Sequence, residues 1–285
     1  MNKKHQALIT GSLILAAAVA ASWWWPLPAP RLLGAGPAVA LVLLSFACGY
    51  VDASLGMGYG STLTPLLLLL GFKPLDVIPA IVASQLAGGA AGSLAHHYVG
   101  NVDLHPGRRS FKVAAVLAVT SLAGAVFGAL LASRVPELYL QVWVGVLVCG
   151  VGVATIALYG RHFQFSWKRI IALGVFAAFN KGTTGGGYGP VIMGGQLLAG
   201  VASKDAVGIT TLAETLTCVT GTVTFVVASG GVRWPLAPFL IAGALAAVPF
   251  SALTVSVLKG HHLKIAVGVL TFALGALTLL KTFVF

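Results

Sequence analysis

The chain has 285 residues, of which 58% are hydrophobic and only 8% are charged. Soluble domains carry about 25% charged residues, so this composition excludes an ordinary water-soluble domain. The apolar runs are continuous rather than alternating, which excludes a β-barrel and favours membrane-spanning helices. The formal charge of +11 comes from basic residues in short gaps between apolar runs. That pattern is typical of membrane topology and not of nucleic-acid binding.

Apolar segments follow one another along the whole chain, at about 7–25, 36–55, 59–71, 76–98, 111–132, 138–159, 168–184, 189–200, 205–228, 236–257 and 263–283. The first resembles a signal peptide, but it leads into Trp23, Trp24 and Trp25, which suit an interfacial aromatic belt. We favour a retained helix over a cleaved one. A crossing needs roughly 20 apolar residues, so 59–71 and 189–200 are too short to span. We predict that each pairs with the preceding segment as a broken, re-entrant hairpin.

The two halves of the chain resemble each other in sequence. A shift of 129 residues aligns Gly56, Gly58, Tyr59 and Gly60 with Gly185, Gly187, Tyr188 and Gly189, and a shift of 123 aligns 144–147 with 267–270. An ordered series of matches indicates a duplication. We predict repeats at 36–159 and 168–285, preceded by an N-terminal helix and periplasmic linker at 1–35. Each repeat contains a hairpin and three crossings, and an odd number of crossings gives the repeats opposite orientations.

The basic residues indicate the orientation. With a cytoplasmic N-terminus, Lys181 lies within the membrane, eleven of the 17 Lys and Arg residues fall inside, and those outside are Arg31, Lys73, Arg134, Arg233 and Lys281. This is the positive-inside bias. The sequence therefore predicts an all-α polytopic protein of the cell inner (plasma) membrane with a periplasmic C-terminus. It has two inverted-topology repeats, each a re-entrant hairpin plus three transmembrane helices, and one extra N-terminal helix.

Each repeat has a glycine-rich break, at 52–65 and 180–190. Glycines let the backbone leave the helix and approach a ligand, and the short helix after each break presents free N–H groups to an anion. We expect the breaks to form facing halves of one anion site, with close helix packing as the alternative. The candidate binding residues are Asp52, Gly58, Tyr59, Gly60, Ser61 and Gln85 in the first repeat and Lys181, Thr183, Thr184, Gly186, Gly187, Tyr188 and Gly189 in the second.

Two charged residues lie in predicted membrane segments of the second repeat. Lys181 is a functional candidate because an intramembrane charge is costly; the alternative is a side chain that snorkels to the interface. Glu214 lies mid-way along 205–228, and the shift of 129 pairs it with Gln85. It is a candidate for proton coupling or, alternatively, a static partner of Lys181.

The remaining polar residues suggest no metal site. We expect Asp76 and Asp205 to be helix N-caps. The neighbours His96 and His97, like His261 and His262, point to different helix faces, and the three cysteines form no metal-binding spacing.

A family resemblance follows from the breaks. The stretch from Leu55 to Pro65 is similar to the first signature of the TauE/SafE sulfite-exporter family, and 185–190 together with 205–212 resembles the second. The resemblance covers nearly all of the chain after residue 36. It implies a permease for small sulfur-containing anions such as sulfite, thiosulfate or organosulfonates. The first break departs from the pattern, since Met57 stands where the second has Gly186.

We therefore expect a secondary transporter that exports such anions by alternating access, with proton coupling at Glu214. A passive anion channel is the alternative, and a membrane enzyme or scaffold ranks below it, because no catalytic constellation is present. The expected partners are a small inorganic or organosulfur anion and membrane lipid, with a homodimer left open. No cofactor, metal or nucleic acid is expected.

Overall fold

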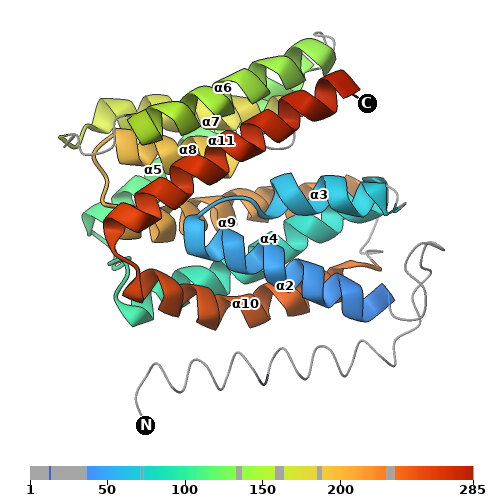
Figure 1. Cartoon of the computed structure of the whole chain (residues 1–285), viewed down its shortest axis with the longest axis horizontal. Coiled ribbons are helices and arrows are strands. Elements are labelled where there is room, and N and C mark those ends of the chain that lie inside the picture. The colour runs from blue at the N-terminus through green and yellow to red at the C-terminus, as the bar shows by residue number, and fades with distance from the viewer. Residues whose placement is uncertain are drawn as a thin grey trace. The chain divides into compact units, whose positions relative to one another are not determined.

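The computed structural model describes residues 13, 37–70, 72, 74–132, 137–157, 164–184, 188–228 and 235–284. All elements of this part are helices (Figure 1): α2 (Pro37–Leu55), α3 (Tyr59–Leu69), α4 (Pro74–Val99), α5 (Arg109–Ala132), α6 (Glu137–Ala157), α7 (Trp167–Thr184), α8 (Tyr188–Leu198), α9 (Ser203–Ala228), α10 (Ala237–Val257) and α11 (Gly260–Val284). Each coincides within a few residues with a predicted apolar segment, so the all-helical prediction is confirmed. The segment 7–25, apart from residue 13, lies outside the described residues.

Helix lengths bear on the membrane prediction. In the part that the structure describes, 38–55, 203–223 and 237–257 are long and apolar enough to cross a bilayer by length and composition. The helices α3 and α8 have 11 residues each, or about 16 Å at the usual helical rise. This is roughly half of the hydrocarbon thickness, so neither spans alone. Re-entry of these helices from one side of the membrane stays a prediction.

The ends of α4 follow from local sequence. Pro74 occupies the first helical position, where its missing N–H costs nothing. At the other end Gly100 has a φ of 85°, its N–H donates to His97 O at 3.1 Å, and Asn101 N donates to His96 O at 2.9 Å. These two bonds form a Schellman motif. Asp76 lies in the first turn of α4, inside the helix rather than at the expected cap position, where it still interacts favourably with the helix dipole.

The chain forms two compact units that are interleaved in sequence. Unit 1 comprises residues up to Ser54, Gly58–Asn101 and Glu214–Val257, and unit 2 comprises Leu55–Met57, Val102–Ala213 and Leu258–Phe285. Within unit 1, α10 packs on α4, and within unit 2, α5 packs on α7. Since α4 and α5 belong to the first predicted repeat and α7 and α10 to the second, each unit contains helices of both repeats. Repeats and units are therefore different divisions of the chain.

A glycine lies at a close helix crossing in each unit. In unit 1, a Cβ on Gly243 of α10 would lie 2.7 Å from Ser45 Cβ on α2. In unit 2, a Cβ on Gly174 of α7 would lie 3.0 Å from Thr120 Cβ on α5. The repeat shifts pair Ser45 with Gly174 and Gly243 with Thr120. The two crossings are therefore equivalent, with the glycine on opposite partners.

The α6–α11 contact in unit 2 is reciprocal. A Cβ on Gly152 would lie 2.8 Å from Phe272 Cα, and one on Gly275 would lie 2.8 Å from Cys149 Sγ. The shift of 123 pairs Gly152 with Gly275 and Cys149 with Phe272. Gly152 therefore contacts Phe272, and the equivalent of Gly152 contacts the equivalent of Phe272. Such a reciprocal contact is typical of a two-fold axis. Figure 1 shows the two helices side by side.

Candidate functional site

The first break is a glycine turn closed by a carboxylate. After α2, the chain turns through Gly56 and Gly58, whose φ angles of 72° and 116° favour glycine. Asp52 Oδ1 then accepts a hydrogen bond from Tyr59 N at 3.1 Å. Because this N–H belongs to the first turn of α3, the positive end of α3 already has a carboxylate of the same chain beside it.

The Tyr59 side chain anchors α3 within unit 1. Its buried phenol oxygen lies 2.8 Å from Ser45 Oγ on α2 and 2.8 Å from Ser84 Oγ on α4. Ser45 in turn donates to Leu240 O on α10 at 2.6 Å. The start of the short helix is therefore tied by hydrogen bonds to the helices around it.

Tyr188 anchors α8 in the corresponding way within unit 2. Its hydroxyl lies 2.9 Å from Ser121 Oγ on α5, and Ser121 donates to Leu117 O at 2.6 Å. The shift of 123 pairs Leu117 with Leu240. Both breaks thus end on a tyrosine that is linked through a serine to the same place on α5 or α10.

The two breaks meet in unit 2. A Cβ on Gly189, at the start of α8, would lie 3.0 Å from Met57 Cα and 3.2 Å from Gly56 O. One turn further along α8, Met193 Sδ lies 3.2 Å from the Cβ position of Gly56. Thr271 of α11 lies 3.2 Å from Met57 Sδ. The first break therefore packs directly on the beginning of the short helix that follows the second break.

Gln85 and Glu214 contact each other in unit 1. Gln85 Nε2 on α4 donates to Glu214 Oε1 on α9 at 3.1 Å, and the two residues are 129 positions apart, which is the repeat shift. A residue that contacts its own repeat counterpart lies near the axis that relates the repeats. Gln85 also borders the first break, since a Cβ on Gly60 would lie 3.7 Å from its Nε2.

The second break is described in part. Lys181, Thr183 and Thr184 lie in the last turn of α7, and their side chains, like that of Ser61, lie outside the described part. Gly186 and Gly187 also lie outside the described residues. Around the break, α7 and α8 pack antiparallel, because Gly195 meets Leu173 and Arg169 Nη1 donates to Leu198 O at 3.4 Å.

A buried histidine fixes the end of α2 before the first break. His96 Nε2 lies 2.8 Å from Ala53 O, one of the last carbonyls of α2. Because a carbonyl only accepts, Nε2 carries the proton, and Nδ1 accepts from Asn101 Nδ2 at 3.0 Å. Asn101 Nδ2 also donates to Ala252 O on α10 at 2.8 Å. The imidazole is therefore neutral and supplies a hydrogen bond that the interrupted helix lacks.

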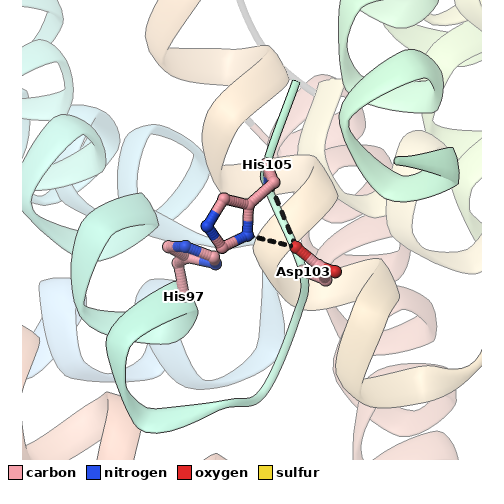
Figure 2. A group of neighbouring side chains, drawn as sticks. All are labelled: His97, Asp103 and His105. Carbon is pink, nitrogen blue, oxygen red and sulfur yellow. Dashed lines mark hydrogen bonds and ion pairs between the residues drawn. The ribbon is translucent and has the colours of Figure 1, made fainter. Parts of the chain in front are cut away.

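The loop between α4 and α5 is ordered by an acidic residue. Asp103 Oδ1 accepts from His105 N at 3.1 Å and lies 2.8 Å from His105 Nδ1, as Figure 2 shows. These hydrogen bonds hold the pKa of the exposed Asp103 carboxyl below its usual value. Arg108 Nε lies 3.0 Å from Asp103 Oδ2. Exposed ion pairs contribute little stability, so this loop is a local turn beside basic residues.

Several residues around the breaks have no signal in the sequence. Ser45 and Ser121 are single small polar residues in apolar helices, where they are usually helix-packing residues. His96 and Asn101 are polar residues at a helix end, which is common at the membrane surface. The alignment of Tyr59 with Tyr188 does not predict the serines either, because the repeat shifts pair Ser45 with Gly174 and Ser121 with Ala244.

Comparisons with known proteins identify the family of the chain. A family model described as sulfite exporter TauE/SafE matches residues 41–278. The probable membrane transporter protein YtnM of Bacillus subtilis (strain 168) is 28% identical over 246 residues, which cover 82% of this chain and 80% of the relative. The family match includes both breaks and every helix from α3 to α10. The chain therefore belongs to the TauE/SafE sulfite exporter family of membrane transporters.

Proposed function

We propose that this chain is a secondary transporter of the cell inner membrane that exports small sulfur-containing anions, such as sulfite or organosulfonates. Transport proceeds by alternating access, with the anion bound at the second break, between Lys181 and the start of α8. A transporter, rather than an enzyme, is what the family and the relative have in common. The anion, the direction of transport and the site are our proposal.

The observation that carries the proposal is the electrostatic difference between the two short helices. Asp52 accepts a hydrogen bond from the first turn of α3, whereas the first turn of α8 contains no acidic residue. The residue at the position equivalent to Asp52 is Lys181. A helix N-terminus with a lysine nearby favours an anion, and one beside a carboxylate does not. This narrows the expectation of two facing halves of one anion site to one anion-binding half.

The charges of the two units support the same assignment. In the full sequence, unit 1 has five Lys and Arg residues against the three carboxylates Asp52, Asp76 and Glu214, while unit 2 has twelve Lys and Arg residues against three carboxylates. An anion is therefore attracted to unit 2, where the first break meets α8. Gly56 and Met57 of the first break, which contact the start of α8 within unit 2, serve as the opposing wall, and Glu214 carries the coupling proton.

Reciprocal contacts support the inverted repeats that alternating access needs. The pair Gln85–Glu214 in unit 1 and the α6–α11 crossing in unit 2 each join residues that the repeat shifts make equivalent. In transporters with inverted repeats, one half rocks against the other around a fixed site. A passive channel needs no such arrangement.

Transport of sulfite by the purified protein in proteoliposomes tests the proposal. We expect counterflow of radiolabelled sulfite, which a carrier supports and a channel does not. Lys181→Ala should weaken the apparent affinity about tenfold or more, because a hydrogen bond to a charged group contributes about 1.5–3 kcal/mol. Lys181→Arg should retain part of it.

The control is Lys168→Ala, which removes an exposed charge near the start of α7 and should leave the affinity unchanged. Unitary currents without counterflow would establish a channel instead. An unaltered affinity in Lys181→Ala, with counterflow intact, would remove Lys181 from the site while leaving the transporter proposal standing.

A further inference from the structure

Gln196 on α8 has a buried side-chain amide, of which one atom has no hydrogen-bond partner among the described residues. Its side chain is fully buried, and its Nε2 donates to Thr210 Oγ1 at 2.6 Å and lies 3.5 Å from Ala206 O, both on α9. Its Oε1 has no hydrogen-bond partner among the described residues. Buried polar atoms are nearly always paired, because leaving one unpaired costs stability.

The fold does not require an amide at this position. The repeat shift pairs Gln196 with Leu67, which is also fully buried, in the core of unit 1. A leucine at the equivalent place on α3 has no polar atom to satisfy. The glutamine of α8 therefore carries a cost that its counterpart avoids, and such a cost persists where the group has a function.

Gln196 lies on the face of α8 that meets the first break. Gly189, Met193 and Gln196 are spaced by four and three residues and so share one face of the helix. Gly189 contacts Met57, and Met193 contacts Gly56. Thr210, the partner of Gln196, lies 3.5 Å from the Cβ position of Gly56 through its own Cβ. The amide thus continues the surface where the two breaks meet in unit 2.

We propose that Gln196 contacts the transported oxyanion at a second binding position on α8, beyond the one at the second break. Rotating the amide by about 180° exchanges the positions of Oε1 and Nε2. Thr210 Oγ1 then donates to Oε1, and the separation of 2.6 Å suits an O–H···O hydrogen bond. Nε2 is then free to donate to an oxygen of the anion. In this arrangement Thr210 gives up its bond to Ala206 O, and that carbonyl keeps its helical partner. This second binding position rests on the proposed function and adds Gln196 to the residues proposed to bind the anion.

Gln196→Leu tests the proposal by separating transport from stability. The variant removes the unpaired atom and copies the residue of the first repeat, so the purified protein should have a thermal midpoint equal to or above that of the wild type. Its KM for radiolabelled sulfite in proteoliposomes should rise about tenfold or more, the size of one hydrogen bond to an anion. Gln196→Glu, which replaces the donor by a negative charge, should raise KM as well.

Leu67→Met is the matched control at the equivalent position of the first repeat, and it should leave KM unchanged. A wild-type KM in Gln196→Leu overturns the proposal, and so does a lower thermal midpoint, since the amide would then be structural. If the wild type transports no sulfite, the proposed substrate fails. The midpoint of Gln196→Leu still decides whether the amide is retained at a cost to stability.

Discussion

Three positions show how single residues differ between repeats of the same backbone. Asp52 corresponds to Lys181, Gln85 to Glu214, and Leu67 to Gln196. Around them the anchoring is alike, because Tyr59 and Tyr188 each end a break on a serine. The two predicted repeats therefore share the tyrosine anchors and differ in their charges. Asp52 precedes one short helix and Lys181 the other, and the proposed anion site at the second break depends on this difference.

The Gln85–Glu214 pair gives a test of proton coupling. In Glu214→Gln the pair becomes two amides, which can still hydrogen-bond each other, so the packing of α4 on α9 is retained. We expect accumulation driven by a pH gradient to disappear and sulfite counterflow, which needs no net proton movement, to stay near the wild-type rate. Both are measured in proteoliposomes.

Asp76→Asn provides the matched control, because Asp76 lies in the first turn of α4 in the same unit. It should keep pH-driven accumulation. If Glu214→Gln also keeps it, Glu214 is a structural partner of Gln85 and another group carries the proton.

Charge makes some candidate site residues conspicuous in the sequence, whereas neutral polar residues are not conspicuous there. Lys181, Asp52 and Glu214 are conspicuous because charges are rare in apolar segments. Gln196 and Ser45 are neutral and small enough to fit an apolar helix, so nothing in one sequence separates them from packing residues. Their importance depends on what faces them across the fold, such as Thr210 for Gln196.

At the scale of elements, helix positions could be predicted and helix partners could not. Long apolar runs fix where α2 to α11 begin and end to within a few residues. These helices are apolar on all sides, so periodicity does not say which face meets which neighbour. The packing of α10 on α4 and of α5 on α7 follows from small residues at particular crossings, which only the structure brings together.

The equivalent crossings Ser45–Gly243 and Gly174–Thr120 can be exchanged as a test. Gly243→Thr should lower the free energy of unfolding by about 1–3 kcal/mol, because the new side chain has no room against α2. Adding Ser45→Gly removes one of the atoms that the new side chain meets and should restore part of the loss, while the backbone atoms Val42 O and Phe46 N of α2 still lie against it. A double-mutant cycle of unfolding in detergent measures the coupling.

Ser45→Gly alone is the control for the hydrogen bonds of Ser45 to Tyr59 and Leu240. A coupling energy of at least about 0.5 kcal/mol in the restoring direction is expected for residues in contact. Additive effects of the two substitutions would mean that the crossings are not interchangeable, and would weaken the case for the duplication.

For the molecule as a whole, the interleaving of repeats and units has a functional consequence. Each compact unit combines helices from both repeats, so a motion of one repeat against the other must change the packing inside both units. The α6–α11 contact joins residues equivalent under the shift of 123, as does Gln85–Glu214 under the shift of 129. In the proposed alternating-access mechanism the repeats exchange conformations, and contacts between equivalent residues would keep their form and act as pivots.

Opposite orientation of the repeats predicts the side of each loop. The Arg109 guanidinium at the start of α5 lies 3.5 Å from the centroid of the Phe165 ring just before α7, so α5 and α7 begin at the same end of unit 2. If α5 crosses to the periplasm and α6 crosses back, the starts of α5 and α7 both lie in the cytoplasm. The three crossings after the second hairpin then leave the C-terminus in the periplasm. A periplasm-dependent reporter fused after residue 285 should be active, and the same reporter fused after residue 164 should be inactive. Activity of the second fusion, or a silent first one, would break the inverted arrangement.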